Sequence, residues 1–248
     1  MSLLRRAALP LVALAVVVAV VAGVAFFVLG GKSDDDAASE RPTEGRASQV
    51  SHAALLDPQD LSGEWVLFST DNFRNDDGSL PDTGNCSAAR TLAAEMSKAN
   101  INRAQRALQL SVPGYTSRAQ VEMHVRIFDK PATAEDFLKR HRTLLTGDGY
   151  IRCLSDGFAA LFGPNARVRF GDARGKAPRD GVTSAFDQDL KVEENVFQLH
   201  TDSYAWTQSN AFVLMLISGP RQLDSNDFVK EALEKAQAKV QAAQNLPK

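Results

Sequence analysis

An unbroken run of 25 uncharged, mostly apolar residues at positions 7–31 constrains this chain more than any other feature. At about 1.5 Å of rise per residue, a helix of that length measures roughly 37 Å, and a bilayer's hydrocarbon core is about 30 Å thick. Arg5 and Arg6 precede the run, whereas Lys32 and the acidic residues 34–36 follow it. Basic residues near a spanning helix favour the cytoplasmic side. The pattern predicts a single-pass anchor in the plasma membrane, with residues 1–6 cytoplasmic and the remainder extracytoplasmic.

A cleavable signal peptide is the alternative interpretation of the same segment. Such a peptide has an apolar stretch of roughly 7–15 residues, followed by small residues at the cleavage site. This run is longer, and its nearest cluster of small residues, positions 37–39, lies beyond three aspartates. Length and charge therefore favour an uncleaved signal anchor.

The rest of the chain is mildly acidic. Once the three basic residues among the first 32 are set aside, 25 basic residues remain against 30 acidic ones. Nucleic-acid binding needs a concentrated positive surface, so this balance argues against it. Residues 32–54 are polar and rich in small side chains, which predicts a flexible tether. Residues 55–248 are numerous enough to form one extracytoplasmic domain with its own core.

Cys86 and Cys153 are the only two cysteines in the sequence. Neither belongs to a Cys-x-x-Cys motif, and both lie outside the membrane in the predicted topology, where disulfides form and persist. We expect a single structural disulfide between them, with two buried free thiols as the alternative.

Hydrophobic periodicity predicts the strands and helices of the domain. Strands are expected over residues 65–68, 121–127, 167–170, 196–206 and 211–217. A helix is expected over residues 87–96. Two more are expected, one from an N-cap at Thr133 to about Leu145 and one from an N-cap at Ser225 to about Val240. Residues 101–110 fit either kind of element. The last two strands form a hairpin, and residues 211–217 contain no polar side chain, which indicates a central strand covered on both faces.

This order of elements predicts an α+β fold, in which an antiparallel sheet carries helices packed on one face. No repeat with a period of 20–50 residues is visible in the sequence.

No motif for catalysis or for metal binding appears in the chain. The four histidines, His52, His124, His141 and His200, have no His or Cys partner at the spacing of metal ligands. The sequence also lacks a nucleophile elbow, a phosphate-binding glycine loop and an HExxH motif. We therefore expect a protein that is not an enzyme and has no metal and no cofactor.

The candidate ligand-binding residues lie on two predicted strands. Four alternate residues of one strand share a face: His200, Asp202, Tyr204 and Trp206. Polar tips beside aromatic rings suit a ligand site, whereas the alternative is a strand face covered by a helix. Arg167 and Arg169 alternate on a second strand and are candidates for receiving an anionic group, the alternative being ordinary solvent-facing arginines.

Several local motifs carry a resemblance to a known family. They are the opening at residues 56–65, the strand end at 125–129 with Ala134 and Phe137 after it, and the pair at 152–153. With these motifs the chain resembles actinobacterial extracytoplasmic sensor-type domains, of the kind found in the lipoprotein LpqN and in the outer domain of the kinase PknH. The resemblance implies an antiparallel sheet flanked by helices, similar to the PsbP-like fold, with a cleft for a ligand.

Two features depart from that family. The kinase's outer domain has two disulfides, whereas this chain has cysteines for one, and a helix replaces the acyl anchor of a lipoprotein.

Two classes of function remain open on the sequence alone. The first is a membrane-anchored extracytoplasmic sensor-type domain that binds a small hydrophobic or amphipathic ligand and has no catalysis of its own. The second is an accessory or structural component of a cell-envelope protein complex, with a protein as its partner. The first class predicts a ligand site with a few polar groups, and the second predicts an exposed apolar surface.

Overall fold

The computed structural model of the chain describes residues 42–69, 84–111, 118–162, 166–192, 195–221 and 226–246. The predicted anchor at residues 7–31 and the predicted helix cap at Ser225 lie outside the described residues. Within these ranges, no helix has the length and the apolar character needed to cross a membrane.

Seven strands form one antiparallel sheet in the order β1-β2-β3-β7-β6-β5-β4. The strands are β1 (Val66–Ser69), β2 (Asn102–Ser111), β3 (Arg118–Ile127), β4 (Arg167–Phe170), β5 (Val182–Val192), β6 (Asn195–Gln208) and β7 (Ala211–Pro220). The predicted α+β class with an antiparallel sheet is confirmed. The ambiguous segment 101–110 is strand β2, which pairs along its whole length with β3.

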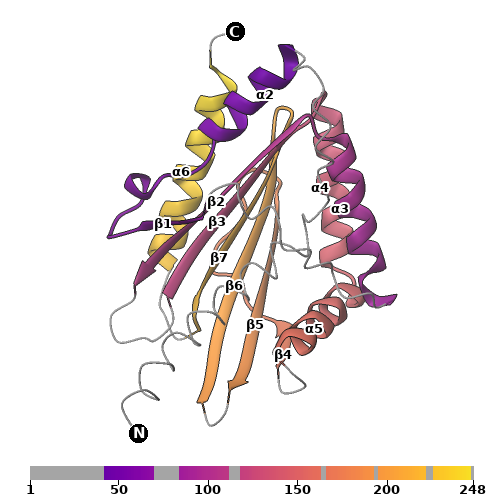
Figure 1. Cartoon of the computed structure of the whole chain (residues 1–248), viewed down its shortest axis with the longest axis vertical. Coiled ribbons are helices and arrows are strands. Elements are labelled where there is room, and N and C mark those ends of the chain that lie inside the picture. The colour runs from indigo at the N-terminus through magenta and orange to yellow at the C-terminus, as the bar shows by residue number, and fades with distance from the viewer. Residues whose placement is uncertain are drawn as a thin grey trace, which may run out of the picture.

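The helices pack on both faces of the sheet (Figure 1). One face carries α2 (Pro42–Ala53) and α6 (Asn226–Gln244), and the other carries α3 (Ser87–Ala99), α4 (Pro131–Leu145) and α5 (Asp148–Phe162). The prediction that helices pack on one face is therefore wrong. Its physical reason is β7, in which every residue is buried, so that an apolar core is required on each side.

The two cores divide the side chains of β7 by their alternation. Phe212, Leu214 and Leu216 pack in the core that contains α3, α4 and α5. Val213, Met215 and Ile217 pack in the core that contains α2 and α6. Successive side chains of a strand point to opposite faces, so one apolar run supplies both cores.

Helix α2 corrects the predicted tether over residues 32–54. Ala47, Val50 and Ala54 are buried against the sheet and α6. The hydroxyl of Ser51 donates a hydrogen bond to Asn102 Oδ1 (2.7 Å) at the start of β2. The segment is rich in small residues, which are common in solvated spacers. Small side chains also allow a helix to pack closely on a sheet, and α2 packs through such residues.

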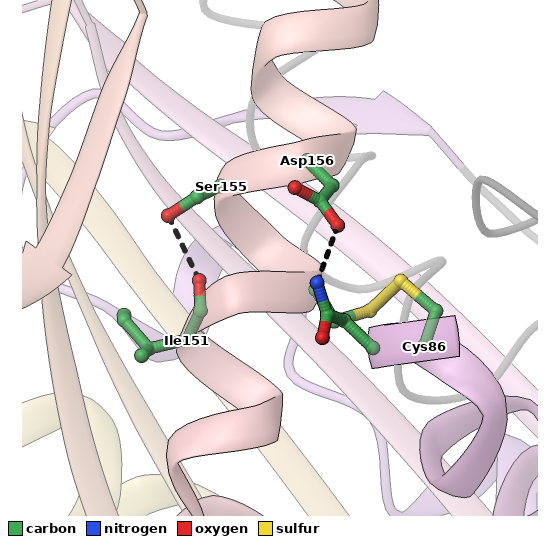
Figure 2. Close-up of a disulfide and its surroundings, with 6 residues drawn as sticks. Cys86, Ile151, Ser155 and Asp156 are labelled. Carbon is green, nitrogen blue, oxygen red and sulfur yellow. Dashed lines mark hydrogen bonds between the residues drawn. A yellow bond between two sulfur atoms is a disulfide. The ribbon is translucent and has the colours of Figure 1, made fainter. Parts of the chain in front are cut away.

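The predicted disulfide between Cys86 and Cys153 is confirmed. Figure 2 shows the bridge between the start of α3 and the middle of α5, a helix that the sequence analysis missed. Beside it, Asn85 Nδ2 donates a hydrogen bond to Asp156 Oδ2 (2.9 Å). Both cysteines are fully buried, so the bridge joins two helices inside the core.

One helix boundary differs from expectation, and one strand was not expected at all. Helix α4 begins at Pro131, with Lys130 at its N-cap position, so Thr133 lies in its first turn and is not its cap. Proline suits the first helical position because its missing N–H has no partner there. Strand β5 was not predicted, because polar residues occupy both of its faces: Ser184, Asp187, Gln188 and Asp189.

We predict that Val50→Asp destabilises the domain, whereas Gln49→Asp next to it does not. The first places a carboxylate in the α2–sheet core, and we expect a loss of roughly 3 kcal/mol in the free energy of unfolding. The second changes an exposed residue of the same helix and should cost less than about 0.5 kcal/mol. Urea unfolding of both variants measures the difference. If the two variants are equally stable, residues 42–54 do not pack against the sheet and are a tether, as the sequence predicted.

Candidate functional site

A cluster of charged side chains lies at the corner of the sheet formed by β4, β5 and β6, on the face that carries α2 and α6. At its centre is His200, one of the predicted ligand residues, which is 6% exposed. Its Nδ1 lies 2.9 Å from Asp187 Oδ1, and its Nε2 lies 3.1 Å from Asp202 Oδ1. A carboxylate accepts but does not donate, so both ring nitrogens must carry a proton. The arrangement therefore holds His200 as an imidazolium between two carboxylates.

The pKa values of this pair follow from that arrangement. Burial alone would lower the pKa of His200, but its hydrogen bonds to Asp202 and Asp187 outweigh burial and raise it above the ordinary value. Burial alone would raise the pKa of Asp202, but His200 and Arg174 together hold it below the ordinary value. The cluster is thus a set of charges that stabilise one another's ionised forms.

Arg174 is the second partner of Asp202 and was not identified from the sequence. Its backbone N–H donates to Asp202 Oδ1 (3.0 Å), and its Nε donates to Asp202 Oδ2 (2.6 Å). Asp202 is completely buried, so the guanidinium neutralises a carboxylate that has no access to water. Arg174 lies in the irregular segment between β4 and β5, where no periodicity marks it.

Arg169 and Arg167, the second predicted pair, lie on the edge strand β4. Arg169 donates from Nη1 to Asp189 Oδ2 (2.8 Å), and its Nε lies 3.5 Å from Asp187 Oδ2. Arg221 also approaches Asp187, with Nη2 3.1 Å from Oδ2. Arg167 is exposed and lies directly opposite Asp189 in the strand register. The structure therefore brings Arg169 into the His200 cluster through Asp187 and leaves Arg167 at its margin.

Tyr204 and Trp206, the remaining predicted residues, are completely buried in the core beneath α6. Neither Tyr204 Oη nor Trp206 Nε1 has a hydrogen-bond partner among the described residues. Burial, together with the nearby charge of Asp202, raises the pKa of Tyr204. The alternative given above, a strand face covered by a helix, describes these two residues.

A second polar region lies on the opposite face of the sheet, where the sequence analysis named no candidate. Five side chains form a row across five strands, and we call this row the polar band: Gln109, Gln120, Ser218, Thr201 and Gln188. Each is at most 2% exposed. Thr201 Oγ1 lies 2.8 Å from Ser218 Oγ, and Gln188 Nε2 donates to Thr201 Oγ1 (3.3 Å). Glutamine and serine occur at isolated positions in the sequence, so only strand pairing reveals the row.

Several polar atoms of the band and its surroundings lack a partner in the described part of the chain. They are Gln109 Nε2, Gln120 Nε2, Gln188 Oε1 and Ser184 Oγ. Each buried polar atom without a hydrogen bond costs about 1–3 kcal/mol. The band is therefore able to offer donors and an acceptor to a bound molecule.

Charged and apolar groups flank the band on the same face. His124 Nε2 lies 2.7 Å from Glu122 Oε1, one step along β3 from Gln120. Leu216 stands directly opposite Glu122, and Phe186 stands opposite Thr201. The band thus borders the apolar core of α3, α4 and α5.

Neither region has the arrangement of a metal centre. Across the described ranges, no three His, Cys, Asp or Glu side chains gather so that they could hold a metal ion. At the corner, protons of His200 and of the guanidinium groups face the carboxylates.

Comparisons with known proteins give a likeness in structure alone. No family model matches the chain, and no curated protein matches it. Among solved structures, the extracellular domain of PknH from Mycobacterium tuberculosis aligns over 84% of this chain and 99% of that chain, at 16% identity and a TM-score of 0.43.

We predict that the contribution of His200 to stability depends on pH. The pKa of His200 is raised in the folded protein, so its stabilisation is fully present below about pH 6.5 and disappears as pH rises through the raised value. His200→Gln should therefore destabilise the protein more at pH 5.5 than at pH 9. Denaturant unfolding of both proteins across this range measures the difference, and a difference that grows with pH would contradict the arrangement.

A second histidine should have the opposite pH dependence. His141 of α4 is completely buried beside Phe212, neither ring nitrogen has a partner among the described residues, and burial lowers its pKa to about 4. The unfolded chain binds this proton near pH 6.5, so stability is lost as pH falls from there towards 4, by roughly 3 kcal/mol. His141→Leu should remove this loss. Parallel pH–stability curves for wild type and variant would refute the prediction.

Proposed function

We propose that this protein is a membrane-anchored extracytoplasmic domain of the sensor type, which binds a small amphipathic ligand and has no catalysis of its own. The observation that carries the proposal is the polar band, a row of buried amide and hydroxyl groups that includes unpartnered donors and an unpartnered acceptor. Folded proteins satisfy most buried polar groups, so a row of amide and hydroxyl groups with several unsatisfied atoms favours a binding role.

The surroundings of the band support an amphipathic ligand. Amide and hydroxyl groups would hydrogen-bond a polar head, while Leu216 and Phe186 on the same face would contact an apolar body. Ligand sites commonly combine an apolar lining with a few polar groups that fix orientation. A purely anionic ligand has less support, because Arg169 and Arg174 are both engaged by carboxylates.

The extracytoplasmic location rests on two features of the chain. The Cys86–Cys153 disulfide suits an oxidising compartment, and the apolar run at residues 7–31 supplies the anchor. The sequence resemblance to LpqN-type and PknH-type outer domains, with the PsbP-like fold, agrees with this proposal and forms part of it.

An accessory role in a cell-envelope protein complex is the second candidate. It is supported by β1 at the edge of the sheet, where Val66 is 53% exposed and Leu67 is 50% exposed. An edge strand with exposed apolar side chains is a site at which another chain can pair. In this case the protein would bind a partner through β1 and carry no ligand at the band.

We predict that the full chain, purified from membranes in mild detergent, carries a bound molecule on the order of a few hundred daltons in native mass spectrometry. Gln120→Leu should release it, because the substitution removes an amide of the band. Gln208→Leu is the matched control, since Gln208 is a buried glutamine on the opposite face of the sheet.

Three outcomes separate the candidates. Loss of the bound mass in Gln120→Leu alone supports the proposal. Retention of the mass in both variants places the ligand elsewhere. A wild-type protein without any bound mass, together with a crosslinked envelope protein that Leu67→Asp abolishes, supports the accessory role.

A further inference from the structure

The segment between β4 and β5, residues 171–181, folds back over the sheet face that carries the His200 cluster, and we call it the strap. The backbone N–H of Gly171 donates to the Ala185 carbonyl oxygen (2.9 Å), and that of Ala177 donates to Thr183 Oγ1 (2.8 Å). From the other side, Arg142 of α4 donates to the Asp180 carbonyl oxygen (2.6 Å). The apolar residues of the strap are small, so polar contacts provide most of its attachment.

The central contact of the strap is a guanidinium bound to a buried carboxylate. Arg174 engages both oxygens of Asp202, through its backbone N–H (3.0 Å) and its Nε (2.6 Å). Its Nη2 also points to the Ile217 carbonyl oxygen of β7, at 3.5 Å. Asp202 is 0% exposed, and it accepts two hydrogen bonds from Arg174 of the strap.

Tyr204 lies beside this contact with an unsatisfied hydroxyl. Its Oη is completely buried and has no partner in the described part of the chain. Gly175 of the strap covers it so closely that a Cβ at position 175 would lie 3.2 Å from Oη. The oxygen of this hydroxyl can accept a hydrogen bond from a donor placed at the position of the Arg174 guanidinium.

The charged groups of this corner, which contact Asp202, Asp187 or Asp189, come from all three of its strands and from the residue after β7. They are Arg169 on β4, Asp187 and Asp189 on β5, His200 on β6 and Arg221 after β7. From α6, the groups that meet the strap at Gly175 are apolar, Val229 and Leu233. If Arg174 leaves, His200 is the remaining described cation in contact with Asp202, and it is shared with Asp187.

We propose that Arg174 is a built-in occupant of a cation-accepting site, and that the guanidinium group of a small external molecule can replace it. The carboxylate of Asp202, the hydroxyl of Tyr204 and the carbonyl of Ile217 are the acceptors. The planar guanidinium fits this set, because its several N–H donors diverge in one plane. This site lies on the opposite face of the sheet from the polar band and is independent of the proposed function.

Chemical rescue tests the proposal in the full chain in detergent. Arg174→Ala should lower the melting temperature, and methylguanidinium should raise it again by about 3 °C once the probe exceeds its Kd tenfold. Tetramethylammonium at the same concentration has the same charge and no N–H donor, so it should not rescue. Lys176→Ala removes another strap cation, one that is exposed, and serves as the matched control that gains nothing from the probe.

The outcomes are distinct. Rescue of Arg174→Ala by methylguanidinium alone, and its loss when Asp202→Asn is added, supports the site. An equal response of Arg174→Ala and Lys176→Ala, or equal rescue by tetramethylammonium, overturns it. Should Arg174→Ala not fold, Arg174→Gln keeps the backbone donor to Asp202 and most of the side-chain length, and the same comparison applies to it.

Discussion

The complete burial of β7 is the constraint on which the rest of the structure depends. A strand without a polar side must be covered on both faces, so its alternate side chains require two apolar cores. The chain meets this requirement with α3, α4 and α5 on one side and with α2 and α6 on the other (Figure 1). On the first side, the Cys86–Cys153 disulfide links the start of α3 to α5. On the second side, α2 packs against the sheet and enlarges the core that α6 covers.

Polar groups are buried on both faces of this sheet, and the His200 corner and the polar band differ in how their groups are paired. At the His200 corner, each carboxylate meets a cation, so the charges are compensated within the chain. At the polar band, amide and hydroxyl groups share a few hydrogen bonds and several atoms remain without partners. Compensated charges favour a structural role, whereas unsatisfied neutral groups favour recognition of another molecule. This contrast is the reason for assigning ligand binding to the band.

Much of the sheet was predictable from periodicity. The alternation of Val121, Met123 and Val125 places β3, and the hairpin of β6 and β7 follows from two β-rich runs with polar residues between them. Strand β5 escaped because its residues are polar on both faces, as Asp187 and Gln188 illustrate. A strand at a charged corner has no hydrophobic alternation to reveal it.

The two helices that the sequence analysis missed, α5 and α2, have the hydrophobic periodicity of a helix in a weaker form. In α5, Tyr150, Leu154 and Phe158 recur every four residues and lie on the buried face, but two glycines lower the helix propensity of the segment. In α2 and the residue after it, the buried residues Ala47, Val50 and Ala54 recur at intervals of three and four positions with smaller side chains. A stripe made of alanines has little hydrophobic contrast with its polar neighbours, so a helix and a solvated spacer look alike.

The sequence by itself determined the apolar segment at residues 7–31, the disulfide, the antiparallel class of the sheet and the shared face of His200, Asp202, Tyr204 and Trp206. These features depend on residue type and on the order of neighbouring residues along the chain, so they can be read before the fold is known. Only the tertiary structure decided that α6 and the strap cover that face, that Arg174 meets Asp202, and that five separate residues form the polar band. Such contacts join residues of different strands and loops, 28 positions apart for Arg174 and Asp202, and their geometry exists only once the strands are paired and the helices are packed.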